Sequence, residues 1–151
     1  MKKFLRFLLF LLPWFIGGIL FRSNPVFYKS LNKPFFAPPG ILFGIIWPIL
    51  YILIAISVYN IYKNNNYKNI PDYNKTLIIN YFSNQIFSFL FFTLQSPFLA
   101  LIDTIIVFIS SLFLYYETKE LDKKYSKLLI PYVIWNLFAS ILIISIFFMN
   151  L

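Results

Sequence analysis

Residues 41–62 read ILFGIIWPILYILIAISVYNIY and contain no charged side chain. An α-helix rises about 1.5 Å per residue, so about 20 apolar residues in a row cover the hydrocarbon thickness of a bilayer. The stretch is therefore long and apolar enough to cross a membrane as one helix. A soluble domain of this size has too small an interior to bury such a helix on every side.

Four further stretches of this kind lie around it, at residues 4–21, 76–94, 98–116 and 128–149. The chain of 151 residues is 60% hydrophobic and 12% charged, whereas soluble domains average about 45–50% apolar and about 25% charged residues. The sequence predicts an all-α integral membrane protein, in which residues 1–151 form a single bundle of five transmembrane helices. No small-x-small cleavage site follows the first stretch, so we expect a retained helix rather than a signal peptide.

The basic residues are divided unevenly between the two ends of this bundle. Ten of the thirteen Lys and Arg residues fall at the N-terminus, in residues 63–75 or in residues 117–127. Only Arg22, Lys29 and Lys33 fall at the other end. Because short loops rich in Lys and Arg stay in the cytoplasm, we expect the N-terminus inside and the C-terminus outside.

The composition also excludes whole classes of chemistry. The chain contains no Cys and no His, which excludes zinc and iron–sulfur centres built on those side chains and Cys–His or Ser–His–Asp catalysis. Five carboxylates leave little for general acid–base work, and we expect neither a metal nor a cofactor. In a chain this apolar, the net charge of +8 indicates contact with anionic lipid head groups rather than with nucleic acid.

Residues 22–40 interrupt the apolar pattern with Pro25, Pro34, Pro38 and Pro39. Prolines at this density prevent a long helix, so we expect an ordered or partly extended loop outside the membrane. The loop also carries aromatic side chains that a solvated linker would not keep. We therefore expect its rings to pack against either the membrane interface or the mouth of a cavity, and we predict that the loop is the mobile cover of that cavity.

Three of the helical stretches place aromatic or amide side chains on one face. Phe43, Trp47 and Tyr51 recur at every fourth position. A second face carries Asn80, Asn84, Phe87 and Phe91, and a third carries Trp135, Ala139 and Leu142, with Asn136 and Ser140 one position round. Flat rings and isolated amides on facing helices are typical of a cavity for a planar, mostly apolar ligand.

Simpler interpretations of the same residues stay open. A lone Trp in a membrane helix usually belongs to the interfacial belt, and Asn84 is deep enough that it must find an interhelical hydrogen bond. Asp103 lies near the outer end of its helix, where its carboxylate can reach water. Gly17 and Gly18 offer a flat patch that another helix can approach closely.

Several motifs together resemble the translocator protein family, the TspO/MBR group of tryptophan-rich sensory proteins and peripheral benzodiazepine receptors. The motifs are Tyr28-x-x-Leu31-x-Lys33-Pro34-Phe35-Phe36-x-Pro38-Pro39, Phe43-x-x-x-Trp47-x-x-Leu50-Tyr51, Asn84-x-x-Phe87-Ser88-x-Leu90-Phe91-Phe92, Ala100-Leu101-Ile102-Asp103 and Pro131-Tyr132-Val133-x-Trp135-x-x-Phe138-Ala139-Ser140. They cover essentially the whole chain in order. Phe36 and Phe87 stand where the family commonly has Trp, and Ile143 stands where it usually has Asn.

The resemblance implies a five-helix bundle in a bacterial cell membrane, often a homodimer. Its cavity would bind tetrapyrroles such as protoporphyrin IX and benzodiazepine-type drugs. By position, the ligand-binding candidates are Tyr28, Pro39, Phe43, Trp47, Tyr51, Asn84, Phe87, Phe91, Trp135, Phe138 and Ala139. The propionates of a porphyrin would seek Arg22, Lys29 or Lys33 at the mouth. The C-terminal end lacks the basic residue of the family's sterol pattern. Looser matches lie at Leu53, Tyr59 and Lys63 and at Leu121, Tyr125 and Lys127, and such patterns do not carry a claim of cholesterol binding.

Three functional hypotheses follow. The first is a receptor or transporter-like protein that binds porphyrins without a cofactor. The second is an enzyme that degrades porphyrin in light and oxygen, with Trp47 and Trp135 as its catalytic residues. The third is a structural membrane protein that dimerises through its helix faces. Under the first two, we expect Trp47 and Trp135 to face each other across the ligand cavity.

Overall fold

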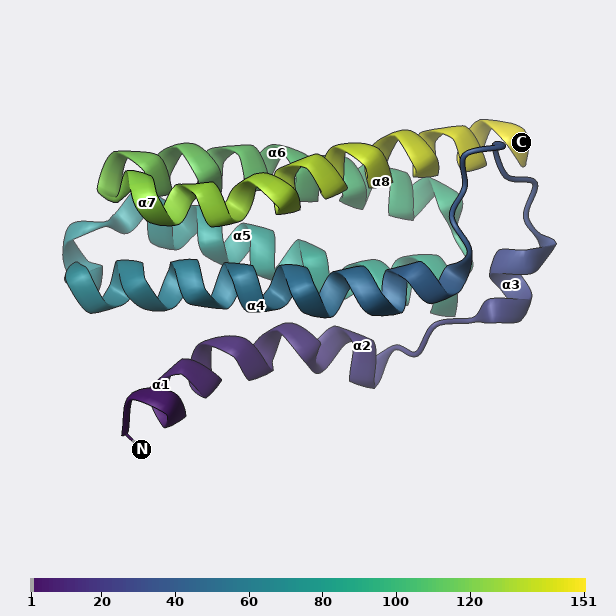
Figure 1. Ribbon diagram of the computed structural model, residues 1–151. Coiled ribbons are helices and arrows are strands. Elements are labelled where there is room, and N and C mark those ends of the chain that lie inside the picture. The colour runs from purple at the N-terminus through teal and green to yellow at the C-terminus, as the bar shows by residue number, and fades with distance from the viewer. Residues whose placement is uncertain (1) are drawn as a thin grey trace.

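The computed structural model describes residues 2–151 and shows helices joined by short connections, without a β-strand among those residues (Figure 1). The first rod is α1 (Lys2–Leu11), which passes through a 3-10 turn η1 (Leu12–Phe15) into α2 (Ile16–Leu20). Pro13 lies in η1, where its missing N–H interrupts the α-helical hydrogen bonding. The predicted first helix therefore exists, but as two pieces with a tight turn between them.

The predicted loop at residues 22–40 contains one short helix, α3 (Pro25–Ser30). The side chain of Asn24 caps α3 by accepting a hydrogen bond from the backbone N–H of Phe27 at 3.0 Å. Pro25 occupies the first turn, where a missing N–H costs nothing. The rest of the loop is extended or turned, as its prolines predict.

The next rod is α4 (Gly40–Asn64), which contains the whole of the predicted span 41–62 and continues through Pro48. A short 3-10 turn, η2 (Tyr67–Asn69), connects it to α5 (Pro71–Ser88). The π-helical turn η3 (Phe89–Thr93) extends α5. Gln95 then adopts a left-handed backbone with a φ of 50°, and the chain reverses.

The second half of the chain is a helical hairpin. It consists of α6 (Pro97–Leu121), the short α7 (Lys123–Ser126), a 3-10 turn η4 (Lys127–Leu129) and α8 (Ile130–Met149). Because α6 packs along both α5 and α8, it lies at the centre of one layer. α4 lies against α7, η4 and α8, while α1 packs on α4 and α2 packs on α5 (Figure 1). The two termini lie at opposite ends of the bundle (Figure 1).

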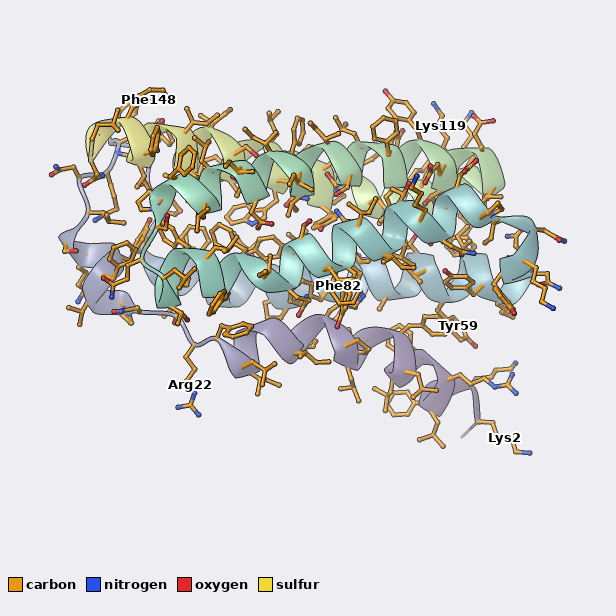
Figure 2. All side chains as sticks on the ribbon, turned by 180° about the vertical axis from the view of Figure 1, so that it is seen from behind. Lys2, Arg22, Tyr59, Phe82, Lys119 and Phe148 are labelled. Atoms are coloured by element: carbon orange, nitrogen blue, oxygen red, sulfur yellow. The ribbon has the colours of Figure 1, made fainter. Side chains whose placement is uncertain are left out.

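Four stretches are long and apolar enough to cross a membrane, namely Lys2–Leu20, Gly40–Asn64, Pro97–Leu121 and Lys123–Met149. Their outer faces carry large exposed apolar side chains such as Ile106 and Phe113, as expected for surfaces that face lipid (Figure 2). The prediction of an all-helical membrane protein is confirmed. The fifth span stays a prediction, because the amides of Asn80, Asn84 and Gln85 lower the hydropathy of α5.

The helices also extend further than the hydrophobic pattern predicts at some ends. α6 continues to Leu121, five residues beyond the predicted span 98–116, through a charged segment that we expected to lie outside the membrane. α5 likewise begins at Pro71 rather than at residue 76. A helix that already has its hydrogen-bond ladder can extend into water with charged side chains, so helix ends and membrane boundaries need not coincide.

Candidate functional site

A continuous group of rings lies between α4, α8 and the 22–40 loop. We call it the aromatic cluster and define it by seven residues: Tyr28, Phe36, Phe43, Trp47, Tyr51, Trp135 and Phe138. On α4, the one-turn spacing puts Phe43, Trp47 and Tyr51 on one face, as the sequence predicts. Phe43 and Trp47 contact Trp135 of α8, whereas Tyr51 contacts Trp14 of η1.

The centre of the cluster is the contact between Trp47 and Trp135. Their ring centroids lie 6.5 Å apart and the rings are nearly perpendicular, at 86°. Phe43 packs edge-on against Trp135 at 5.8 Å, and Tyr51 packs against Trp47 at 5.6 Å. The two tryptophans, which we expected to face each other across a ligand cavity, are therefore in direct ring contact. Their part in binding a ligand stays a prediction.

Loop residues cover this cluster on the side of the C-terminus. The Tyr28 ring packs against Phe43 at 6.0 Å, and the Phe36 ring packs against Phe138 at 6.3 Å. The Tyr28 side chain is buried, its hydroxyl donates a hydrogen bond to the Pro38 carbonyl at 2.9 Å, and burial raises its pKa above the ordinary value. Tyr28 therefore stays neutral at physiological pH and holds the two ends of the loop together.

Two further contacts anchor the loop. The Asn150 side chain accepts a hydrogen bond from the Asn32 N–H at 3.0 Å and donates one to the Asn32 carbonyl at 2.9 Å. The Lys33 ammonium donates to the carbonyls of Tyr28 at 2.6 Å and Leu31 at 2.8 Å. Lys33 thus closes the loop on itself, whereas Arg22 and Lys29 are exposed.

A buried network of hydrogen bonds lies below the aromatic cluster. The hydroxyl of Tyr51 donates to Asn84 Oδ1 at 3.0 Å, and Asn84 Nδ2 donates to the Tyr132 hydroxyl at 3.3 Å. The Tyr132 hydroxyl donates to Asn80 Oδ1 at 2.9 Å, and Asn80 Nδ2 donates to Ser110 Oγ at 2.9 Å. These bonds join α4, α5, α8 and α6, and they give Asn84 the interhelical partners that its depth demands.

Gln85 connects this network to the first rod. Its Nε2 donates to Asn84 Oδ1 and to the carbonyl of Trp14, each at 3.2 Å. Its Oε1 accepts a hydrogen bond from the Gly17 N–H at 2.6 Å. A Cβ atom on Gly17 would lie 2.5 Å from the Gln85 backbone oxygen, so only glycine fits there. The close approach of another helix that we expected at Gly17 and Gly18 is thus made at Gly17, by α5 of the same chain.

Three buried polar atoms near this network have no hydrogen-bond partner among the described residues. They are Trp135 Nε1, Asn136 Nδ2 and Asp103 Oδ2. The Asp103 side chain is 5% exposed, so its carboxylate does not reach water as the simpler interpretation suggested. The indole N–H of Trp135 is a donor in the aromatic cluster that is available to a hydrogen-bond acceptor on a ligand.

The other predicted site residues lie at the edge of the aromatic cluster. Phe87 and Phe91 stack on each other at 5.5 Å and contact the loop through Phe27, which packs against Phe91 at 5.5 Å. Ala139 is half-buried on α8, next in the chain to Phe138. Pro39 is exposed and precedes the first residue of α4, so it shapes the start of the helix.

Sequence patterns alone did not single out Tyr132 as the centre of the polar network, and they missed Gln85 altogether. Tyr132 is fully buried and contacts Asn80 and Asn84 at once. The sequence did contain a signal for Gln85. It is a second amide directly after Asn84 in an apolar segment, and such an amide needs a hydrogen-bond partner on another helix.

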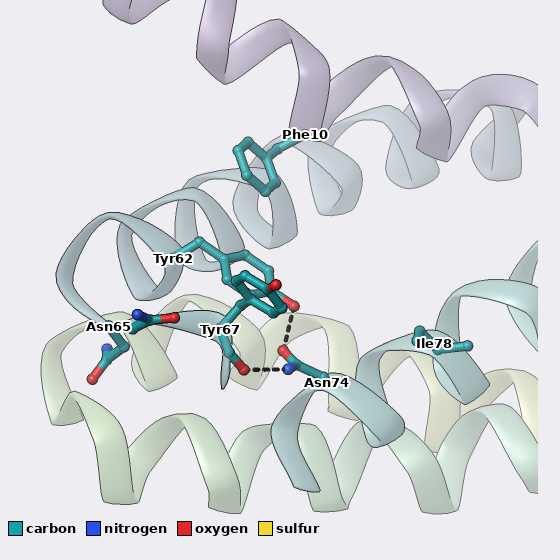
Figure 3. A pocket seen from close by; sticks show the side chains of 7 residues that line it. Phe10, Tyr62, Asn65, Tyr67, Asn74 and Ile78 are labelled. Atoms are coloured by element: carbon teal, nitrogen blue, oxygen red, sulfur yellow. Dashed lines mark hydrogen bonds between the residues drawn. The ribbon is translucent and has the colours of Figure 1, made fainter. Parts of the chain in front are cut away.

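Two hollows on the described part of the chain lie away from the aromatic cluster. One has a volume of about 630 Å³ and lies at the end of the bundle that carries the N-terminus (Figure 3). The other is a groove of about 240 Å³ between α5 and α6, lined mainly by lipid-facing isoleucines. The rings of the aromatic cluster pack on one another, so a ligand that enters there must separate them.

Comparison with known proteins shows similarity along almost the whole chain. The model of the TspO/MBR family matches residues 6–149. The tryptophan-rich protein TspO of Bacillus cereus is 37% identical over 137 residues, which cover 91% of this chain and 89% of that protein. The uncharacterized membrane protein YtaB of Bacillus subtilis is 38% identical, with 89% and 87% of the two chains covered. A TspO protein of Archaeoglobus fulgidus is 36% identical over 140 residues, with 89% and 88% covered.

Proposed function

Because this chain belongs to the TspO/MBR family of membrane proteins, we propose that it is a receptor or transporter-like protein for planar tetrapyrroles such as protoporphyrin IX. The same site would take benzodiazepine-type ligands. The observation that carries the proposal is the aromatic cluster, in which Trp47 and Trp135 meet inside the bundle. Among residues 2–151, the Trp135 indole N–H has no hydrogen-bond partner. Flat aromatic faces and one free donor suit a flat, apolar ligand with few acceptors.

The 22–40 loop supplies the entrance in this proposal. Withdrawal of Tyr28 and Phe36 removes the rings that cover Phe43 and Phe138, and it opens a path from the membrane surface to Trp135. The ligand then takes the place of the loop rings. The energy of the lost ring contacts, about 0.5–1.5 kcal/mol per pair, is recovered by stacking on the porphyrin.

Charge at the mouth complements the ligand class. A porphyrin dicarboxylate carries its negative charge at one edge, and Arg22 and Lys29 are exposed residues of the loop itself. Lys33 already donates to backbone carbonyls, so we expect Arg22 and Lys29 to meet the propionates first.

A titration of protoporphyrin IX in lipid nanodiscs, followed by absorption, tests this proposal. We expect Phe138→Ala to weaken binding several-fold, because it removes a ring from the cluster. The matched control is Phe113→Ala, which removes a 58% exposed ring from the lipid-facing side of α6. Equal affinity of both variants would contradict the proposed position of the ligand.

A second candidate function is light- and oxygen-dependent degradation of porphyrin. The contact between Trp47 and Trp135 favours it, because two oxidisable indoles would lie against the bound ligand. In this case Trp47→Phe or Trp135→Phe would abolish the loss of porphyrin in light while most of the binding remains. Unchanged porphyrin after illumination of the parent protein with oxygen would leave only the receptor function.

We further propose that α5 and η3 form the fifth crossing of a bacterial cell membrane, with the N-terminus inside and the C-terminus outside. The excess of basic residues at the N-terminal end supports this orientation. For a homodimer, the outer face of α2 offers Gly18, which is exposed and has open space around it. Cross-linking of Gly18→Cys between two copies in membranes would test that interface.

A further inference from the structure

The hollow at the N-terminal end of the bundle has both a polar floor and an apolar wall (Figure 3). Phe10 of α1, Tyr62 of α4 and Ile78 of α5 supply the apolar wall. The floor is formed by the connection between α4 and α5, with the amides of Asn65 and Asn66 and the ring of Tyr67, and by the amide of Asn74 near the start of α5. Its volume is about 630 Å³, and it is an open depression on the surface rather than an enclosed cavity.

Internal hydrogen bonds fix the shape of the floor. The Tyr62 hydroxyl donates to Asn74 Oδ1 at 2.7 Å, and Asn74 Nδ2 donates to the Tyr67 carbonyl at 2.7 Å. The ring of Phe10 stacks on Tyr62 at 5.8 Å. Asn66 uses its side-chain oxygen to accept a hydrogen bond from the Lys68 N–H at 3.1 Å, so its amide N–H₂ group is left as a donor. The amides of Asn65 and Asn74 already donate to backbone carbonyls, so Asn66 supplies the donor that the hollow offers to a ligand.

Basic residues are next to the lining residues in the sequence. Lys63, Lys68 and Lys75 each directly follow a residue of the lining, and all three are exposed. The Lys68 ammonium lies 6.0 Å from the centre of the Tyr67 ring. Arg6 lies one turn before Phe10 on the same face of α1. Asp72 is the acidic residue nearest in sequence to the lining, so the rim is net positive.

The hollow lies near the ends of two predicted membrane spans, because Tyr62 is the last residue of the span 41–62 and Ile78 is the third residue of the span 76–94. Phe10 lies eight residues beyond the start of α1, or about 12 Å along the helix. Ile78 is 56% exposed on the outer surface, so the apolar wall continues into the lipid-facing side of α5. A ligand here would place a charged group among the amides and lysines and an apolar group against the helices.

We propose that this hollow binds the head group and glycerol region of an anionic phospholipid from the leaflet on the N-terminal side. The lipid phosphate accepts hydrogen bonds from Asn66 and pairs with the surrounding lysines, and its acyl chains lie along the exposed surface near Ile78. The site is separate from the aromatic cluster, so it does not depend on tetrapyrrole binding.

Native mass spectrometry of the protein released from nanodiscs tests this site. The probes are phosphatidylglycerol and phosphatidylcholine with the same acyl chains. The test variant combines Lys63→Gln, Lys68→Gln and Lys75→Gln. Its control combines Lys119→Gln, Lys123→Gln and Lys124→Gln, which removes equal charge from exposed positions at the same end (Figure 2 labels Lys119 and Lys2 there).

We expect the parent and the control to retain phosphatidylglycerol in preference to phosphatidylcholine. The test variant should lose at least about tenfold of that preference, since one basic residue near a membrane surface contributes about fivefold. Equal losses in both variants would mean unspecific surface charge and would overturn the site. Full displacement of the lipid by inorganic phosphate would also overturn it in favour of a free anion.

A second pair of variants tests the hollow without a change of charge. Ile78→Trp puts a large ring against the hollow and should lower retention of phosphatidylglycerol several-fold. Ile79→Trp adds the same ring at the next position, which is 43% exposed and does not line the hollow. Equal retention by these two variants would contradict the proposal.

Discussion

At the scale of single residues, buried polar groups determine how tightly the helices fit. Tyr132 contacts two asparagines of α5 from α8, and both amides lie where water does not reach them. A polar group without a partner inside a membrane protein is costly, so each of these bonds restricts how α5 and α8 can move.

Tyr132→Phe should lower the free energy of unfolding by about 1–2 kcal/mol, because it leaves Asn80 Oδ1 without its donor and Asn84 Nδ2 without its acceptor. Thermal unfolding in detergent measures the effect. Tyr116→Phe is the control, since that ring is 58% exposed on α6. Identical unfolding of the two variants would show that the network does not stabilise the bundle.

Gly17→Ala should destabilise the protein by about 1–3 kcal/mol, because the new Cβ would lie 2.5 Å from the Gln85 backbone oxygen and push α2 away from α5. Gly18→Ala should be neutral or slightly stabilising, since no atom lies within 4 Å of its Cβ and alanine favours a helix. Thermal unfolding compares the neighbours directly. The reverse order of stability would contradict the packing of α2 on α5.

At the scale of elements, the 22–40 loop is held to the end of α8 by a small number of contacts. Asn150 bonds Asn32 through both atoms of its amide, and Tyr28 and Phe36 add ring contacts to α4 and α8. A segment fixed by so few bonds opens at a lower free energy than the helices do. This makes the loop the element best suited to admit a ligand.

Asn150→Ala should therefore speed amide hydrogen exchange in residues 22–39 and leave exchange in α6 unchanged. Addition of protoporphyrin IX should slow exchange in the same residues of the parent protein. Hydrogen-exchange mass spectrometry measures both effects. If neither the substitution nor the ligand changes exchange in the loop, the loop is not the cover of the aromatic cluster.

At the scale of the whole molecule, the odd number of proposed crossings puts the two ends of the chain on opposite sides of the membrane. Reporter fusions at Lys68, between α4 and α5, and at Leu151 should therefore report opposite sides, with Lys68 inside. Reporters on the same side would rule out a crossing by α5 and η3. The test concerns α5 because its amides lower its hydropathy, so its crossing is the one that the hydropathy of the chain does not establish.

The sequence predicts much of this architecture because apolar runs and prolines act locally. The helix at residues 41–62 and the break in the helices at residues 22–40 could be predicted without knowing which segments pack against them. The one-turn spacing of Trp47 and Tyr51 likewise predicted their common face. Partners across helices were harder to predict. Neither the link from Gln85 to Gly17 nor the central place of Tyr132 follows from periodicity, because each depends on the rotation of two packed helices.

The most direct test of the aromatic cluster as the ligand site uses the three tryptophans. Protein labelled with ¹⁵N at the indoles gives one N–H resonance each for Trp14, Trp47 and Trp135. The ring current of a porphyrin is strong and short-ranged, so we predict that protoporphyrin IX shifts the resonances of Trp47 and Trp135 and moves that of Trp14 far less. Trp14 lies behind Tyr51, outside the Trp47–Trp135 contact. A shift confined to Trp14, or no shift at saturating ligand, would contradict the account.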